Sequence, residues 1–207
     1  MEGLTREILD LTLEHLWLVF VAMMIAGSVG IGGGILLTRR PSWRGWILGF
    51  ANVMQTVPSL ALFGFLIPIP FIGGIGKHTA ILALVLYAIL PVLRNTVAGI
   101  QGVDPAVIEA ARGMGMTHSQ ALLRVQLPLA SPLIFAGLRT TLVLVISTAT
   151  LGNFIGAQGL GDVIASGINI SDRIVFLGAV MVATLALLAD WALSLLEGAV
   201  VPRRTAA

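Results

Sequence analysis

Side chains suited to catalysis or to metal binding are scarce in this chain. The histidines His15, His78 and His118 are isolated from one another, and no pair has the helical spacing of metal ligands. The chain contains no cysteine, which excludes a disulfide framework and a thiolate metal site. No glycine-rich phosphate loop ending in Gly-Lys-Ser or Gly-Lys-Thr occurs, so we expect no nucleotide site of this kind on the chain itself. The residues therefore predict no catalytic residue, no metal and no cofactor on the chain itself.

The charged residues Arg139 and Asp190 stand inside long apolar segments. Arg139 lies 11 residues after Pro128, about 16 Å along a helix, and Asp190 lies six residues before Leu196, about 9 Å. Both lie toward the same end of their segments, so a salt bridge is geometrically possible, with Arg94 as a rival partner for Asp190. Charges inside a membrane usually serve function, so gating is one interpretation. A structural pair, or side chains that reach the interface, is the other.

Polar residues interrupt another apolar segment, around Pro58. They are Asn52, Gln55, Thr56, Pro58 and Ser59. An unpaired polar group in lipid is costly, so these side chains should face protein or water. We expect them to line a solute pathway, with Pro58 as a flexible break. The alternative is that they bond to neighbouring helices.

The composition identifies the class of protein. Of the 207 residues, 57% are hydrophobic and only 11% are charged, and the mean hydropathy is +0.99. A soluble domain of this length needs more charge to cover its surface, so we expect an all-α polytopic membrane protein. The net charge is +2 and no basic stripe with interleaved aromatic residues occurs, so nucleic acid is not expected as a partner.

Five apolar segments predict a single transmembrane domain over residues 1–207. The first segment has no charged residue over 22 positions, enough to cross a hydrocarbon core of about 30 Å. No positive region precedes it as in a secretory signal, so we expect it to be retained. The expected spans are residues 16–37, 46–67, 80–97, 129–146 and 174–196.

The distribution of Lys and Arg predicts the orientation of these spans. With the loop after the first span placed inside, eight basic residues fall inside and three fall outside. The eight are Arg39, Arg40, Arg44, Arg94, Arg112, Arg124, Arg203 and Arg204, and the three are Arg6, Lys77 and Arg173. We therefore expect an outside N-terminus and an inside C-terminus, which an odd number of spans also requires.

A polar hairpin, expected at residues 104–126, separates the third span from the fourth. Asp104-Pro105 is typical of a helix start, because Asp caps free backbone N–H groups and Pro suits the first helical position. Gly113 and Gly115 are expected to end this helix, since glycine adopts positive φ at little cost.

A second short helix is expected to complete the hairpin. Thr117 with Gln120 three residues later resembles a capping box. We expect this helix to end at Leu127-Pro128, where the next span begins. The result is two short helices at an angle, held beneath the membrane.

The first helix and its glycine turn are suited to docking another protein. Small alanines permit close approach, Glu109 supplies a charge, and the methionines supply adaptable apolar contacts. The expected docking residues are Glu109, Ala110, Ala111, Arg112, Met114, Gly115 and Met116. The alternative is an ordinary amphipathic connector.

The hairpin resembles the EAA signature of binding-protein-dependent ABC importer permeases. Glu109-Ala110-Ala111 is followed by Gly115 and by Leu127-Pro128, with Val125 where isoleucine is usual. Three further stretches resemble the osmoprotectant branch, which imports glycine betaine, choline, carnitine or related quaternary ammonium compounds. They are residues 55–62 (QTVPSLAL), 136–140 (AGLRT) and 154–161 (FIGAQGLG).

This resemblance covers about residues 15–198 and implies the type I ABC importer permease fold (MetI-like), with about five transmembrane helices and a cytoplasmic coupling hairpin. Two permease subunits, the same chain or a related one, would pair in the bacterial cytoplasmic (inner) membrane, in contact with its lipid. Their hairpins would dock on two copies of a cytoplasmic ABC ATPase, which binds ATP and Mg. An extracytoplasmic solute-binding protein would deliver the solute.

The predicted function is ATP-driven import of an osmoprotectant by alternating access. A methionine or other amino-acid importer permease is the alternative within the superfamily, because such permeases share part of the motifs. An ATP-independent secondary transporter or channel is the alternative outside it, and it leaves the hairpin without a purpose.

The glycine-rich outer segment, residues 155–171, is expected to support a gate or a short helix that receives the binding protein, or to be a re-entrant connector. Asp162, Asp172 and Arg173 are expected to be exposed there and available for contacts with that protein. Scattered aromatic residues such as Trp17 and Tyr87 are expected to pack or to face lipid.

Overall fold

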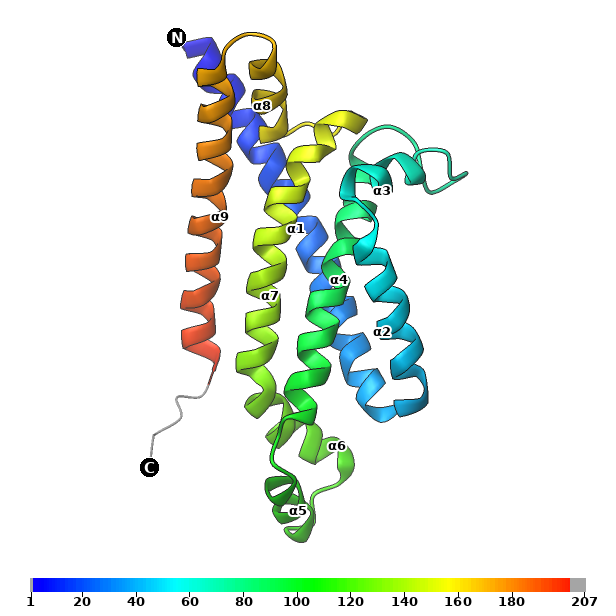
Figure 1. The fold of residues 1–207 in the computed structure, drawn as a ribbon. Helices are drawn as coiled ribbons and strands as arrows, with labels where there is room; N and C mark the ends of the chain where they lie inside the picture. The colour runs from blue at the N-terminus through cyan, green and yellow to red at the C-terminus, as the bar shows by residue number, and fades with distance from the viewer. Residues whose placement is uncertain (1, 202–207) are drawn as a thin grey trace.

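Residues 2–201, the part of the chain that the computed structural model describes, are built from helices and their connections (Figure 1). The long helices are α1 (Glu2–Arg39), α4 (Lys77–Gln101), α7 (Leu127–Ala149) and α9 (Asp172–Val200). The shorter helices are α2 (Pro41–Thr56), α3 (Ser59–Leu66), α5 (Pro105–Gly113), α6 (His118–Ala121) and α8 (Leu160–Ile168). A π-helical turn (Leu122–Gln126) joins α6 to α7, and a 3-10 segment (Thr150–Ile155) follows α7. The predicted all-α class is confirmed.

Four of the five expected spans lie within long helices. α1, α4, α9 and the helix that contains α7 are each long and apolar enough to cross a membrane. These helices extend beyond the expected spans because polar residues at their ends continue the same backbone hydrogen bonding. α1, for example, begins at Glu2, well before the expected start at residue 16.

The second expected span, residues 46–67, is broken into two helices. α2 ends at Thr56 and α3 begins at Ser59, and the two helices are bent by 101° relative to each other. Pro58 has no N–H to donate, and its ring disfavours helical geometry at Val57, which has φ −68° and ψ 126°. The break falls at Pro58, where a flexible break was expected, and the bent pair makes a fifth crossing only if it is counted as one span.

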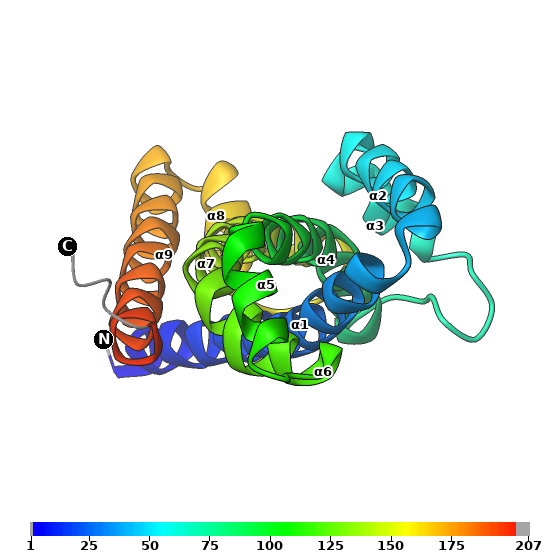
Figure 2. The same cartoon turned by 90° about the horizontal axis from the view of Figure 1, so that it is seen from below.

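Three helices, α1, α4 and α7, form the centre of the bundle. Viewed from the hairpin end, α9 flanks them on one side and the α2–α3 pair flanks them on the other (Figure 2). Leu18, Phe63, Leu84 and Ile146 are fully buried in the main apolar cluster. α2 contributes no buried residue, so its apolar faces remain available to lipid or to another subunit.

Glycines let α1 and α4 cross closely. A Cβ atom added to Gly30 would lie 2.7 Å from Cβ of Val92, and one added to Gly34 would lie 2.6 Å from Cβ of Thr96. Such distances are too short for two carbon atoms. The side chains of α4 therefore pack directly on the backbone of α1, as small residues permit in membranes. Gly32, in contrast, has no neighbour within 4 Å of an added Cβ.

We expect Gly34→Ala to lower the thermal stability of the protein and Gly32→Ala to leave it unchanged or raised. Overpacking at a close helix crossing costs about 1–3 kcal/mol, whereas alanine is favoured over glycine in a helix where space allows. The melting temperatures of the two variants in detergent test this. Equal effects of the two substitutions would contradict the crossing geometry.

Helix α1 begins and helix α9 ends at opposite ends of the bundle. α1 begins at the end that carries α8, and α9 ends at the end from which α5 and α6 project (Figure 1). This is the arrangement that an odd number of crossings requires. Arg203 and Arg204, two of the residues expected inside, lie outside the described residues, and Arg94, counted with the loop after the third span, lies within α4.

Candidate functional site

The first helix of the hairpin, α5, is capped as the sequence predicts. A carboxylate oxygen of Asp104 accepts a hydrogen bond from the backbone N–H of Ala106 at 2.8 Å, and Pro105 occupies the first turn. The start of α5 therefore satisfies a free backbone donor without help from another chain. This local stability allows α5 to stand outside the bundle, where Figure 1 places it.

The end of α5 is closed by a glycine turn. Gly115 has φ +83°, its N–H donates to the carbonyl of Arg112 at 2.9 Å, and the N–H of Met116 donates to the carbonyl of Ala111 at 3.2 Å. These two bonds form a Schellman motif, which needs a residue in the left-handed conformation. Gly113 is the last helical residue, so only Gly115 of the two predicted helix-ending glycines makes the turn.

The second arm begins with the predicted capping box but does not end where expected. The hydroxyl of Thr117 accepts from the N–H of Gln120 at 3.3 Å, and the side-chain oxygen of Gln120 accepts from the N–H of Thr117 at 2.8 Å. The prediction that this helix ends at Leu127-Pro128 is wrong, because the chain continues into α7 through a π-helical turn. There the N–H of Leu127 donates to the carbonyl of Leu122, and Pro128 lies in the first turn of α7, where its missing N–H does little harm.

The expected docking residues lie together on the hairpin, which projects from the bundle (Figures 1 and 2). Met114 is 72% exposed, whereas Ala111 is 2% exposed. Ala111 therefore belongs to the packing of the hairpin and offers no surface of its own. Glu109, Ala110, Arg112 and Gly115 are exposed and Met116 is half-buried.

The structure brings Arg139 of α7 and Asp190 of α9 together. The guanidinium of Arg139 donates from Nε to Oδ1 of Asp190 at 2.8 Å and from Nη2 to Oδ2 at 2.7 Å. This bidentate geometry fixes the orientation of both side chains. Arg94, the rival partner, donates instead to the side-chain oxygen of Asn52.

Glu197 is a third member of this charge network that sequence reasoning missed. Its Oε2 lies 3.4 Å from Nη1 of Arg139. Glu197 falls seven residues after Asp190 on α9, two helical turns along the same face, and this spacing was the signal for it. Arg139 of α7 thus binds two carboxylates on α9. The side chains of Arg139, Asp190 and Glu197 are 35%, 30% and 25% exposed.

Of the candidate pathway residues, two face α4 and three lie at or near the break between α2 and α3. Asn52 bonds to Arg94, and Nε2 of Gln55 lies 3.4 Å from the carbonyl oxygen of Tyr87, so both side chains face α4. Thr56 donates to the carbonyl of its own helix at Val53, at 2.7 Å. Thr56 and Pro58 are exposed, and Ser59 is half-buried at the start of α3.

Tyr87 supports the break between α2 and α3, a role that the sequence did not indicate. Its side chain is 8% exposed, and its hydroxyl donates to the carbonyl of Val57, the residue at the break. This hydrogen bond satisfies a carbonyl that left its helical partner when the helix bent.

We expect Tyr87→Phe to weaken the α2–α3 bend by about 1 kcal/mol, the net worth of one buried hydrogen bond. Transport should fall more than folded yield, because the bend lies among the candidate pathway residues. Uptake per folded molecule, compared with uptake by the wild type, measures the effect. Unchanged uptake would show that the bend does not need this bond.

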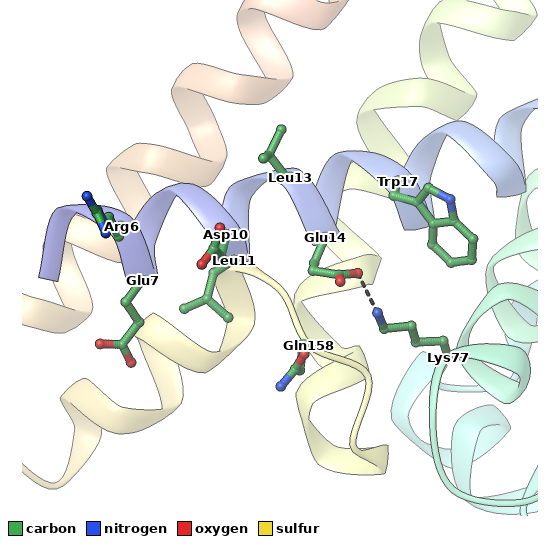
Figure 3. Close-up of a pocket in the computed structure, with 9 residues that line it drawn as sticks. All are labelled: Arg6, Glu7, Asp10, Leu11, Leu13, Glu14, Trp17, Lys77 and Gln158. Atoms are coloured by element: carbon green, nitrogen blue, oxygen red, sulfur yellow. Dashed lines mark hydrogen bonds and ion pairs between the residues drawn. The ribbon is translucent and has the colours of Figure 1, made fainter. Parts of the chain in front are cut away.

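A hollow of about 1100 Å³ opens at the end of the bundle opposite the hairpin (Figure 3). Glu14 of α1 forms an ion pair with Lys77 at 2.6 Å, and the Lys77 ammonium lies 5.8 Å from the centre of the Trp17 ring. Glu7 and Asp10 line the same hollow, on the same face of α1 as Glu14. The sequence did not predict this cluster, because Lys77 lies far from α1 along the chain.

The outer glycine-rich segment forms a 3-10 turn and then helix α8. Asp162 was expected to be exposed, but it is half-buried. Its carboxylate accepts from the side-chain amide of Asn153 at 2.5 Å and from the backbone N–H of Gly159 at 2.8 Å. Asp162 therefore holds this segment together, and the exposed candidates at this end are Asp172 and Arg173.

Two glycines of this segment lie where a larger residue would not fit. Gly156 has φ +74°, and a Cβ on Gly161 would lie 1.9 Å from the carbonyl oxygen of Thr150. His15 of α1 is buried beside this segment, with Nε2 3.1 Å from the carbonyl oxygen of Ile146 in α7. The segment is thus packed against the bundle as an ordered structure.

Comparisons with known proteins identify the relatives of this architecture. Residues 30–201 match the family described as "Binding-protein-dependent transport system inner membrane component". The chain is 44% identical to the carnitine transport permease protein OpuCB of Listeria monocytogenes, over 96% of this chain and 90% of that protein. It is 42% identical to the glycine betaine/carnitine/choline transport system permease protein OpuCB of Bacillus subtilis (strain 168), over 95% of this chain and 90% of that protein. It is also 42% identical to the choline transport system permease protein OpuBB of the same strain, over 95% of this chain and 89% of that protein.

Solved structures share the fold. An inward-facing structure of the MetNI methionine ABC transporter has a chain that superposes with a TM-score of 0.87 and 23% identity, covering 98% of this chain and all of that one. A chain of an amino acid ABC transporter solved with histidines superposes with a TM-score of 0.77 and 24% identity, covering 95% of each chain. The predicted MetI-like architecture is confirmed, and at this identity the likeness concerns the fold alone.

Proposed function

Because this chain belongs to the family of binding-protein-dependent transport system inner membrane components, we propose that it passes glycine betaine, carnitine, choline or a related osmoprotectant into the cell. As a member of this family it is the membrane permease subunit of an ABC importer and not an enzyme, and a separate ATPase hydrolyses ATP. The solute class rests on 42–44% identity to three permeases of these compounds over 95–96% of this chain.

The proposed assembly contains partners on both sides of the membrane. Two permease subunits, identical or related, pair in the bacterial cytoplasmic membrane with the N-terminus outside and the C-terminus inside. Each hairpin docks on one of two ATPase copies, which carry ATP and Mg. A solute-binding protein approaches the opposite end, where Asp172 and Arg173 are exposed.

Continuity between α6 and α7 supports coupling of the hairpin to the pathway. The second arm passes through the π-helical turn into α7 without a break and so reaches Ala149 near the outer end of the bundle. A displacement of the hairpin by the ATPase therefore moves a rigid helix. ATP and the loaded binding protein each favour one state of the paired permeases, and alternating access follows from these differential affinities.

The broken α2–α3 pair is our proposed pathway surface. Broken helices occur at membrane depth where the chain lines a cavity or is buried in protein, and α2 has no buried residue in the single chain. Thr56 and Pro58 are exposed at the break and Ser59 begins α3, whereas Asn52 and Gln55 bond to α4 and hold the pair against the bundle. In the dimer we place the exposed break toward the second subunit.

Uptake of separately labelled solutes tests the solute class. Proteoliposomes containing this permease, the ATPase and the binding protein would be given labelled glycine betaine, carnitine, choline or methionine in separate experiments. We expect uptake of one or more of the quaternary ammonium compounds and none of methionine. Uptake of methionine alone would contradict the proposal and favour an amino-acid importer.

A further inference from the structure

A second hollow, of about 500 Å³, lies where the last turn of α1, the end of α4 and the hairpin meet. It is distinct from the docking surface, because none of the seven expected docking residues lines it. Its polar lining residues come from all three elements. They are Thr38, Arg39, Gln101, His118, Ser119 and Gln126.

This lining offers hydrogen-bond donors and no carboxylate. Among the described residues that line the hollow, none is Asp or Glu. Nδ1 of His118 lies 3.4 Å from Nη2 of Arg112. A guanidinium only donates, so Nδ1 of His118 is the acceptor in this contact and Nε2 is left as the donor of the ring. Together with the guanidinium of Arg39 and the amides of Gln101 and Gln126, this set is suited to an anion.

The other wall of the hollow is apolar. Ile100, Val103 and Leu122 line it and are each less than 10% exposed on their own. A free phosphate gains nothing from an apolar wall, whereas the glycerol and first acyl carbons of a lipid do. An amphiphilic anion therefore fits the hollow better than a fully hydrated one.

The position of the hollow agrees with the level of lipid headgroups. It lies at the end of α1 and α4, two helices able to cross a membrane. Directly after Arg39, the start of α2 presents Trp43 and Trp46, which are 54% and 85% exposed. Tryptophan side chains of this kind gather at membrane–water interfaces.

We propose that this hollow binds the phosphate headgroup of an anionic phospholipid. The phosphate contacts Arg39 and His118, and the glycerol end contacts Ile100 and Leu122. A bound headgroup joins α1 and α4 to the hairpin while Glu109 and its neighbours stay free for the ATPase. The lipid would thus hold the hairpin, which couples the permease to the ATPase, in a fixed position.

Lipid binding by the full-length permease in detergent tests this proposal. Native mass spectrometry would measure the apparent affinity for phosphatidylglycerol, with phosphatidylcholine and inorganic phosphate as separate arms. We expect Arg39→Gln to lower the affinity for phosphatidylglycerol about tenfold, the loss typical of one charge-assisted hydrogen bond. Arg40→Gln is the matched control, because Arg40 is the next residue and carries the same charge but does not line the hollow. We expect it to change the affinity less than twofold.

His118→Gln provides a second variant if Arg39→Gln disturbs the end of α1, and the melting temperature of each variant reports its folding. A selective loss of phosphatidylglycerol binding in either lining variant assigns the site to the lipid. A selective loss confined to the inorganic phosphate arm would overturn the lipid assignment. Equal losses in Arg39→Gln and Arg40→Gln, with none in His118→Gln, would show general attraction to a basic surface and would also overturn it.

Discussion

Gly115→Val is expected to reduce solute-stimulated ATPase activity of the assembled transporter by about tenfold or more, while the chain still inserts in the membrane. Gly115 has φ +83°, and an added Cβ would meet nothing within 4 Å, so the cost arises in the backbone and not from a clash. A β-branched residue in this conformation costs about 1–3 kcal/mol, and 1.4 kcal/mol is a factor of ten. The Schellman turn would open and move the end of α5, where the expected docking residues lie.

Gly113→Val is the matched control for this effect. Gly113 is exposed, helical and also free of neighbours within 4 Å of an added Cβ, so valine fits there without strain. We expect Gly113→Val to retain most of the coupling. Equal loss in both variants would show that any bulk on the hairpin is harmful and would argue against the turn as the cause.

Glu109→Lys probes the docking surface directly. Glu109 is exposed on α5, so its reversal leaves the fold intact and places a positive charge where the ATPase contact is expected. We expect solute-stimulated ATPase activity to be lost. Normal coupling in this variant would place the ATPase contact elsewhere on the chain.

Arg139→Asp is expected to produce the second large effect, a severe loss of folded permease and of transport. The variant would place three carboxylates together on α7 and α9, where the wild type has a bidentate ion pair at 2.7 and 2.8 Å and a third contact at 3.4 Å. Like charges in a poorly hydrated place repel strongly. Asp190→Arg alone should also fail, because it opposes Arg139 with another guanidinium.

The double variant Arg139→Asp with Asp190→Arg should recover folding and transport. It restores opposite charges across α7 and α9, and the new arginine also lies within two helical turns of Glu197. Folded yield by size-exclusion chromatography and uptake per folded molecule measure the recovery. A double variant no better than either single variant would contradict direct pairing as the source of the effect.

Local signals explain why much of the hairpin was predictable. Asp104 and Thr117 act within a few residues of themselves, and the structure has both caps. The end of the second arm was not predictable in this way. A proline such as Pro128 is compatible both with a break between two helices and with a helix that continues through it. The π-helical turn before Pro128 decides between these two possibilities, and its Leu122 belongs to a buried apolar cluster with Ile100 of α4 and Ala130 of α7, residues that are distant or not helical neighbours in the sequence.

Contacts between distant residues explain what the sequence left out. Pro58 predicted a break, but the 101° bend also involves Tyr87 of α4, which is 30 residues from its partner at Val57. Arg139 and Asp190 lie toward the same end of their apolar segments, and this was enough to predict a salt bridge between them. Glu197 lies just beyond the apolar segment and was not considered. The sequence pattern places Asp162 in a polar loop and predicts that it is exposed. Its hydrogen bonds to Asn153 and Gly159 form only when the loop folds back on itself.

Nucleotide-dependent uptake is the most direct test of the central claim that this chain is the permease of an ATP-driven importer. Proteoliposomes would contain the chain with its ATPase, receive the binding protein outside and ATP inside, and be given labelled glycine betaine. The account predicts uptake that stops when ATP, the ATPase or the binding protein is omitted. Uptake at an equal rate without nucleotide would contradict it and identify a secondary transporter or channel.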